Sequence, residues 1–400
     1  MKERFRDDYV FSSKDRESFM EELAEIQAES TWMENVPGSD LRISSVQPIE
    51  VVPLASKYGL KEDVLTDTAS PEGTQLLLHI DGNTDCLRQT AYAGLLQTAV
   101  GITGPGVGRL WKRSSQIFCE SLNEFLKAQG NSLKLYRCCD KISGVFSSNY
   151  QQMEVATLIT TAETAFVDRM GEPLFEQGYT DHALSSCSWE FPDAEQELID
   201  QYQKLLAGKL NAYGANFSPL VSMVTSNTGA SAATLTPMLT APGRAPFRVG
   251  RGVRIRHDNR QIGGATGCGM EAFKQQAGEM FTLFSDGIEA MSRMADHWIK
   301  NPQNAFIAAC NWAFGERLPR KLASNALEDF MTITGGNPCT MYDIFIGISD
   351  INTEAEKANL AFDRKVEISE NIAKLFSHKN WSDFDLAGQV AWNGAKGGVM

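Results

Sequence analysis

The chain has 400 residues, which corresponds to two or three domains of ordinary size and supplies enough apolar side chains for a large core. Hydrophobic residues make up 42% and charged residues 22% of the chain, with 33 glycines, and this excludes a wholly disordered, collagen-like or coiled-coil protein. The net charge of -13 argues against a protein that coats nucleic acid with its whole surface.

No segment is typical of a membrane span or a secretion signal. The longest stretch without a charged side chain, residues 210–243, contains three prolines and many Ser, Thr and Asn residues, so it cannot form a spanning helix. The first eighteen residues lack the apolar core of a secretion signal. The sequence therefore predicts an intracellular, cytoplasmic protein without a membrane partner.

The cysteine and glycine patterns indicate neither a metal nor a cofactor. No two of the eight cysteines have the C-x-x-C spacing of a zinc or redox site, so we expect reduced, buried thiols. Adjacent Cys138 and Cys139 are expected to point to opposite faces of a strand. The glycine-rich segment 101–109 has neither a G-K-[ST] ending nor G-x-G-x-x-G spacing. Nearby Arg109, Lys112 and Arg113 are expected either on a solvated surface or against phosphates at a helix N-terminus.

The first two-thirds of the chain alternates between helical and strand patterns. An acidic helix is expected near the N-terminus, capped by Ser12 and Ser13, with Phe19, Leu23 and Ile26 on one face. The elements expected after it are strands at 41–54 and 73–80, helices at 85–100 and 110–128, strands at 133–139 and 142–150, a helix at 151–168, a strand at 182–191, a helix at 193–209 and three β segments within 216–257.

The last third is helical throughout. Methionine, phenylalanine and other apolar residues recur at helical spacing from Met270 to Trp298, which predicts one long helix with a buried face. Further helices are expected at 303–314, 320–332, 340–348, 353–377 and 382–392. The predicted fold class is α+β, with an N-terminal mixed α/β region with antiparallel strands followed by a C-terminal helical region. The predicted units are an acidic helical segment (1–40), an α+β domain (41–262) and a helical region (263–400).

The sequence contains no motif of a hydrolase or metalloprotease. None of the five histidines lies in H-E-x-x-H, and no nucleophile elbow of the G-x-S-x-G type is present. A catalytic site assembled only in space needs no such motif.

Arginines gather between residues 244 and 260, where six of them face one acid, Asp258. If residues 247–256 form a strand, Phe247, Val249, Arg251, Val253 and Ile255 share one face, and Arg248, Gly250, Gly252, Arg254 and Arg256 share the other. At ~3.3 Å per residue, the second face spans about 26 Å, long enough to follow several phosphates. This pattern predicts a polyanion as partner, unless the arginines pair with surface acids.

Single-strand binders combine such a cationic track with aromatic platforms for bases. Lys134 and Tyr136 share one face of the run at 133–138, and Phe146 and Tyr150 lie in the next run, although core packing is the more common fate of such aromatics. The candidate nucleic-acid-binding residues are Arg244, Arg248, Arg251, Arg254, Arg256, Arg260, Lys134, Tyr136 and Arg137.

Three segments together carry a resemblance to a known family. They are LYRCCDKISGVFSSNYQQM, LVSMVTSNTGASAATLTPML and RIRHDNRQ, within about residues 85 to 350. The pattern resembles the phage- and plasmid-encoded family called domain of unknown function 932, with a Ser-x-x-Tyr turn at Ser147, Ser148 and Tyr150 and small residues at Ser226, Thr228 and Gly229. At Asn227-Thr228 the family has an acidic residue, so any role of that acid is not carried over. The resemblance implies a mobile genetic element in a bacterial host and no established activity.

Three hypotheses follow. The first is a non-enzymatic phage or plasmid accessory protein that binds nucleic acid, with single-stranded DNA favoured, in replication, recombination or protection. The second is a structural or host-interaction protein whose Met- and Phe-rich helical third docks a partner or a second copy of itself. The third is an enzyme whose catalytic residues meet only in the folded chain.

Overall fold

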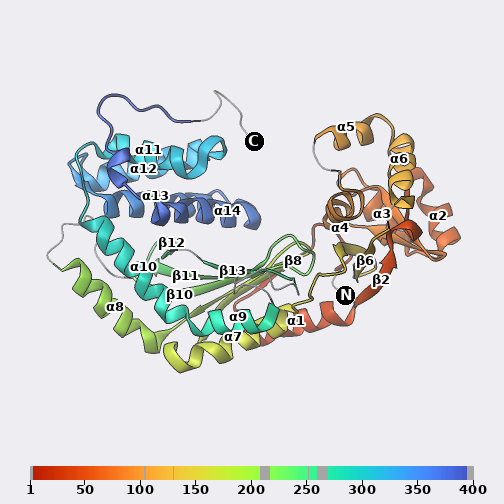
Figure 1. The fold of residues 1–400 in the computed structure, drawn as a ribbon, viewed down its shortest axis with the longest axis horizontal. Coiled ribbons are helices and arrows are strands. Elements are labelled where there is room, and N and C mark those ends of the chain that lie inside the picture. Colours follow the sequence, from red (N-terminus) through yellow and green to blue (C-terminus); the bar gives the residue numbers. More distant parts are fainter. Residues whose placement is uncertain are drawn as a thin grey trace.

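The fold consists of two lobes, each built on its own β-sheet (Figure 1). The computed structural model describes residues 3–102, 105–128, 130–207, 217–250, 252–258 and 269–393. Antiparallel sheets dominate the first two-thirds and helices the last third, so the predicted α+β class is confirmed.

The smaller lobe holds a six-stranded sheet in the order β2-β6-β7-β5-β4-β3. Its strands are β2 (Ser30–Pro37), β3 (Arg42–Ser45), β4 (Leu76–Ile80), β5 (Asn83–Leu87), β6 (Ser132–Cys138) and β7 (Lys141–Ser147). All neighbours are antiparallel except β5 and β7. The helices of this lobe are α2 (Val51–Tyr58), α3 (Glu62–Ala69), α4 (Gln89–Gly94) continued by a π-helical turn (Leu95–Val100), α5 (Pro105–Arg113) and α6 (Ser115–Lys127).

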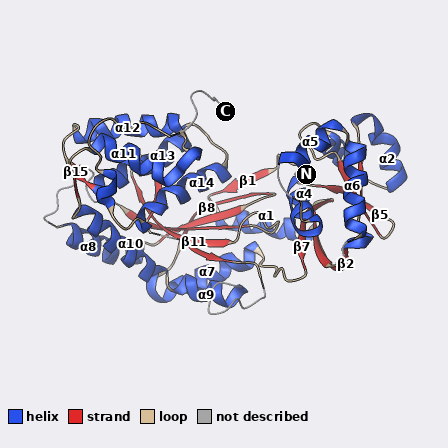
Figure 2. Ribbon diagram, turned by 45° about the horizontal axis from the view of Figure 1, so that its top comes forward, coloured by secondary structure: helices blue, strands red, loops and turns tan. Residues whose placement is uncertain are grey.

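The larger lobe holds a seven-stranded antiparallel sheet in the order β1-β8-β9-β10-β11-β12, with β13 also paired to β11. The strands are β1 (Val10–Ser13), β8 (Leu174–Asp181), β9 (Ser185–Glu190), β10 (Ser218–Thr225), β11 (Ala233–Ala241), β12 (Arg244–Arg248) and β13 (Val253–Ile255). Figure 2 shows these strands running side by side from beneath the C-terminal helices towards the smaller lobe.

Helices cover the larger sheet on both faces. On one face lie α1 (Arg16–Ala28), α7 (Val155–Met170), α8 (Pro192–Leu206), α9 (Gly269–Gly278) and α10 (Met280–Ala295) (Figure 1). Above the β12 end of the other face stand α11 (Pro302–Phe314), α12 (Arg320–Thr334), α13 (Met341–Lys357) and α14 (Phe362–Ala373). A short ladder of β14 (Trp298–Ile299) and β15 (Cys339–Thr340) and 3-10 turns at Gly38–Asp40, Pro48–Glu50, Gly315–Arg317, Lys374–Ser377 and Trp381–Phe384 complete the fold.

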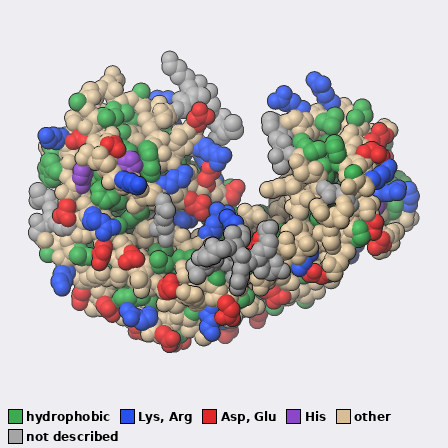
Figure 3. Space-filling view, in the orientation of Figure 1, with side chains coloured by type: hydrophobic (Ala, Val, Ile, Leu, Met, Phe, Trp, Pro, Cys, Tyr) green, Lys and Arg blue, Asp and Glu red, His purple; other side chains and the backbone are tan. Residues whose placement is uncertain are grey.

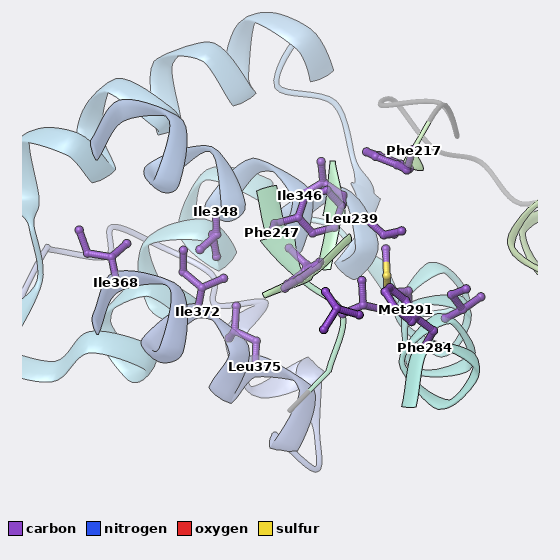
Figure 4. Close-up of a cluster of buried hydrophobic side chains, with 14 of the residues drawn as sticks. Phe217, Leu239, Phe247, Phe284, Met291, Ile346, Ile348, Ile368, Ile372 and Leu375 are labelled. Atoms are coloured by element: carbon purple, nitrogen blue, oxygen red, sulfur yellow. The ribbon is translucent and has the colours of Figure 1, made fainter. Parts of the chain in front are cut away.

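A continuous core joins the larger sheet to these helices. Phe247 of β12 packs edge-on against Phe217 and Phe345, with ring centroids 5.2 and 6.1 Å apart. Figure 4 shows Phe247 beside Leu239 and Ile346, with Ile368 and Ile372 of α14 farther along the same apolar cluster. The sheet and the C-terminal helices therefore share one core, and the predicted boundary near residue 263 falls outside the described residues.

Most predicted elements have the predicted type. The buried face of the methionine stripe is confirmed, but Gly278 and Glu279 divide the expected single helix into α9 and α10. The structure also contains β8, which the sequence analysis missed, and its N-terminal helix is capped by Asp15 instead of Ser12 and Ser13. The predicted helical segment 1–40 is wrong outside α1, because β1 and β2 flank that helix, and the start of the helix predicted over 85–100 is wrong because β5 extends to Leu87. In the C-terminal third, one helix, α13, spans the predicted break near residue 350, and only a 3-10 turn forms within 382–392.

The strand predicted over 41–54 is wrong beyond Ser45. A capping box between Gln47 and Glu50, with Pro48 in the first turn, starts a helical segment that continues as α2. Val51 and Ala55 then face the core at helical spacing. Capping therefore outweighs the β propensity of the two consecutive valines.

Two further findings concern the chain as a whole. In the parts that the structure describes, no helix is long and apolar enough to cross a membrane. The seven described cysteines are all free and buried, as predicted, and Cys268 lies outside the described residues.

Gly287 of α10 lets the strand connection between β12 and β13 approach the helix closely. A Cβ at this position would lie 2.6 Å from the backbone oxygen of Val249. We expect Gly287→Ala to lower the free energy of unfolding by about 1–3 kcal/mol because backbone must shift to make room. Urea unfolding measures the change. Gly108→Ala, in a helix with open space around it, is the control and should leave stability unchanged or raise it.

Candidate nucleic-acid interface

The arginine segment forms two short strands instead of one. Both β12 and β13 pair with β11, with Phe247 opposite Leu239 and Val253 opposite Leu235. Between them Gly250 has a φ of 90°, a left-handed conformation that ends the extended run. The single strand predicted over 247–256 is therefore wrong in its middle.

The predicted alternation of faces nevertheless holds on either side of the break. Phe247, Val249 and Ile255 are buried against the helices, whereas Arg248 and Arg254 lie on the opposite face of the sheet. Arg251 and Arg260 lie outside the described residues. The arginine face therefore consists of two separate parts, one on each strand.

Arg244 and Arg248 on β12 are occupied by helices of the C-terminal third. Arg244 Nη2 lies 3.1 Å from Asp350 Oδ2 on α13. Arg248 donates from Nε to Ser369 Oγ at 3.1 Å, and its Nη2 lies 3.7 Å from Glu370 on α14. Burial lowers the pKa of Arg248. These two side chains hold the helices against the sheet and are not open to a polyanion.

Arg254 and Arg256 differ from that pair. Both are exposed, and neither forms an ion pair with a residue that the structure describes. They are two residues apart at the end of β13, on the side of the sheet away from α7–α10. Among the described residues of the predicted cationic track, they are therefore the ones that are accessible to phosphates.

A hollow separates the two lobes in Figure 3, with Lys, Arg, Asp and Glu side chains around it. Arg256 lines a pocket of about 520 Å³ at the point where the two sheets meet. This junction pocket is lined by Gln97, Thr98, Phe146, Ser147, Tyr150, Gly229, Ser231, Ala232, Arg256, His257 and Asp258. Both lobes contribute to it, so it forms only in the assembled fold.

An aromatic column stands beside the junction pocket. Tyr150 is stacked between Phe146, at a centroid distance of 4.0 Å, and His257, at 5.4 Å. Trp32 stacks on Tyr150 at 5.8 Å and contacts Tyr136 at 4.7 Å. The ring faces of Phe146 and Tyr150 therefore contact one another and other rings. The aromatics considered as candidate platforms for bases are therefore packed into the protein, which is the outcome that the sequence analysis gave as the more common one.

His257 is fixed in this column by hydrogen bonds on both ring nitrogens. Its Nδ1 lies 3.2 Å from Tyr150 Oη, and its Nε2 lies 3.3 Å from Thr225 Oγ1. Burial lowers the pKa of His257 to about 4, so the ring is neutral at pH 7. Among the described residues, the charged side chains that line the junction pocket are therefore Arg256 and Asp258.

The remaining candidates lie on β6 in the smaller lobe. Lys134 Nζ is 3.0 Å from Glu34, and Arg137 donates from Nε to Asp85 at 2.8 Å. Tyr136 is 2% exposed. None of these three candidates lines the junction pocket, so the structure does not bring them together with Arg254 and Arg256.

A second group of cations lies on α5, at the mouth of the hollow (Figure 1). Arg109, Lys112 and Arg113 are exposed, and none forms an ion pair within the described part of the chain. The sequence left these residues either on a solvated surface or against phosphates, and the structure is compatible with both.

The sequence reading missed a row of hydroxyl side chains on the open face of the larger sheet. The register places Ser186 and Ser188 of β9 beside Ser222 of β10, and Thr234 and Thr236 of β11 beside β10 and β13. The alternation of Ser or Thr with apolar residues in β9 and β11 is the signal that could have revealed it. Val224 lies on the same face between Ser186 and Thr234, and Thr234 and Thr236 are buried, so apolar side chains interrupt this row and only part of it is accessible.

Comparison with known proteins adds no relationship, since no family model, curated protein or solved structure matches the chain. Among the described residues, no group of three or more His, Cys, Asp or Glu side chains could hold a metal ion.

The buried His257 predicts a pH dependence of stability. Its pKa is lower in the folded protein than the ordinary value of 6.5, so the unfolded chain binds more protons between pH 6.5 and 4. The stability that neutral His257 provides is therefore present above pH 6.5 and is lost as the pH falls towards 4. Between pH 7 and 4.5, the free energy of unfolding of His257→Asn should fall by about 2 kcal/mol less than that of the wild type. Urea unfolding at each pH measures this difference. Tyr150→Phe keeps the ring buried and should retain the wild-type pH dependence.

Proposed function

We propose that the chain binds single-stranded nucleic acid in the hollow between its lobes, mainly through phosphate contacts with Arg254 and Arg256. The observation that carries the proposal is that these two arginines are exposed and form no ion pair with a described residue, and that Arg256 lines a pocket with walls from both lobes. An anionic strand lying there would neutralise both and release their counterions.

Local charge, and not the net charge of -13, decides binding at this place. Charges separated by more than a Debye length of about 8–10 Å are largely screened at cellular salt. The cations of α5 extend the favourable potential to the mouth of the hollow. A strand that passes from α5 to β13 therefore has basic groups at both ends of its path.

The junction pocket favours a single strand over a duplex. Gln97, Thr98, Ser147 and Ser231 line it with amide and hydroxyl groups beside Arg256. Such groups hydrogen-bond to base edges, and a single strand exposes those edges for contact in a pocket. Because the aromatic column is already stacked with itself, we expect hydrogen bonding and phosphate contact to dominate over base stacking.

The alternative of a partner docked on the Met- and Phe-rich helices gains no support from that stripe. Met280, Met291 and Met294 are completely buried within the chain's own core. A second protein or a second copy would have to use other side chains.

The biological setting rests on the resemblance to the phage- and plasmid-encoded family alone. Within it, we propose an accessory role in replication, recombination or protection of nucleic acid in the bacterial cytoplasm. The binding proposal stands on the geometry of the arginines and is tested without reference to that setting.

Replacing both exposed arginines tests the proposal. We expect Arg254→Ala/Arg256→Ala to weaken binding of a fluorescent single-stranded oligonucleotide and to reduce the slope of log affinity against log salt by about 1.4, at about 0.7 per phosphate. Fluorescence anisotropy across a salt series measures both quantities. The matched control is Arg320→Ala/Lys321→Ala, which removes two exposed cations from α12 and should leave the slope unchanged. Equal slopes for the two double variants would exclude this site.

Replacing Arg248 is expected to change stability and to leave oligonucleotide binding nearly unchanged. Because it is engaged by Ser369 and Glu370, we expect Arg248→Ala to lower the free energy of unfolding by about 1 kcal/mol. Its affinity for the same oligonucleotide should stay within about twofold of the wild type, since a group that is already paired neutralises no phosphate. A large loss of affinity with unchanged stability would show that Arg248 is released to contact the strand.

A further inference from the structure

Two thiols meet at the turn between β6 and β7. Cys138 ends β6, and Cys139 and Asp140 form a tight turn with φ values of 51° and 65°. The prediction that the two cysteines point to opposite faces of a strand is therefore wrong, because Cys139 has left the strand. Their Sγ atoms lie 3.3 Å apart.

The surroundings of Cys138 favour a thiolate. A hydrogen bond from the Cys139 thiol, 3.3 Å away, and the charge of the buried Arg88 guanidinium lower the pKa of Cys138. The thiolate that results holds the Cys139 proton in place, which raises the pKa of Cys139. The pair therefore resembles a nucleophile with an adjacent resolving thiol.

Arg88 is an unusual neighbour for a structural cysteine. Its side chain is 2% exposed, and its Nε has no hydrogen-bond partner. Its Nη1 lies 3.4 Å from the Asp7 carboxylate, which also pairs with the buried Lys141 at 2.9 Å, and Lys141 pairs in turn with Asp67. The two cations and two carboxylates of this group balance one another, and the charge of the nearby Arg88 guanidinium favours a thiolate on Cys138.

Cys138 also lines a pocket of about 280 Å³, separate from the junction pocket. The pocket lies between α1, the start of α7 and the β8–β9 turn, and its polar lining includes Ser143, Asp181, His182 and Thr228. A small oxidant needs far less space than this. The pocket therefore brings a reactant within reach of a thiol that is itself only 4% exposed.

We propose that Cys138 and Cys139 form a peroxide-reactive dithiol, with Cys138 as the attacking and Cys139 as the resolving sulfur. The Cys138 thiolate attacks one oxygen of hydrogen peroxide, the O–O bond breaks, and Cys138 becomes a sulfenic acid. The hydroxide that leaves takes up the proton lost from Cys138 and becomes water.

In the second step Cys139 loses its proton and attacks the Cys138 sulfur. The S–O bond breaks, the hydroxyl group leaves with that proton as a second water, and a disulfide joins the neighbours. Both sulfurs together lose two electrons, and the peroxide gains them. The Cα atoms of neighbouring residues are about 3.8 Å apart, shorter than the usual separation across a disulfide, so the bond is strained and readily reduced again. The reaction is therefore reversible by a small thiol.

Mass spectrometry of the full-length protein tests the proposal. After brief treatment with hydrogen peroxide, we expect the tryptic peptide of residues 138–141 to lose two hydrogens, and dithiothreitol should restore its original mass. Cys187 and Cys310 are internal controls, because each is fully buried and burial raises the pKa of each thiol. They should stay unmodified under the same treatment.

Two variants assign the roles. Cys139→Ser should stop at the sulfenic acid on Cys138, which a 1,3-diketone reagent traps, whereas Cys138→Ser should slow oxidation of Cys139 by about tenfold or more. Circular dichroism confirms that each variant is folded. If the wild-type peptide keeps its mass while Cys187 or Cys310 is oxidised, or if Cys138→Ser reacts as fast as the wild type, the dithiol assignment is wrong.

Discussion

The join between the two sheets determines the geometry of the candidate site. Gln151, just beyond β7, donates its backbone N–H to the carbonyl of His257 at 3.2 Å, and Tyr150 forms a β-bridge with Asp258. The stacking of Tyr150 on His257 adds a side-chain contact at the same place. A segment that follows the smaller sheet is thus joined to a segment that follows β13, so that Arg256 lines the same pocket as Gln97 and Thr98 of the other lobe. Without this join, the smaller lobe would not form the second side of the hollow.

The same join explains why aromatic residues near the arginines do not serve as base platforms. A rigid connection between two sheets needs contacts that resist sliding, and stacked rings with hydrogen-bonded ends provide them. Tyr150 is held by Phe146 on one face and His257 on the other, so its large apolar area stabilises the connection. What is left for a ligand is charge and hydroxyl groups, with little exposed ring surface.

Local sequence patterns predicted well which face of a strand each residue occupies. They predicted poorly which arginines form ion pairs. Two-residue alternation correctly placed Phe247 and Ile255 in the core and Arg248 and Arg254 opposite them. Whether an arginine is paired depends on acids that arrive from elsewhere, and Glu370 lies more than a hundred residues beyond Arg248. A window of sequence contains no information about such a partner. The sequence pattern also failed to predict the turn after β6. The left-handed conformation of Cys139 in that turn brings together two thiols that a continuous strand would separate.

The division of the arginines has a physical consequence for how a strand would be bound. Arg244 and Arg248 bind side chains of the C-terminal helices and fix these helices above the sheet, so this side of the larger lobe is rigid. Exposed arginines at Arg254 and Arg256 then meet a ligand without first breaking an ion pair, so the cost of desolvating and separating charges is low. Binding through few phosphates and polar side chains depends strongly on salt and little on base sequence. If a strand binds there, the fold favours recognition that depends little on base sequence, because the described aromatic side chains maintain the architecture and the exposed Arg254 and Arg256 make the contact.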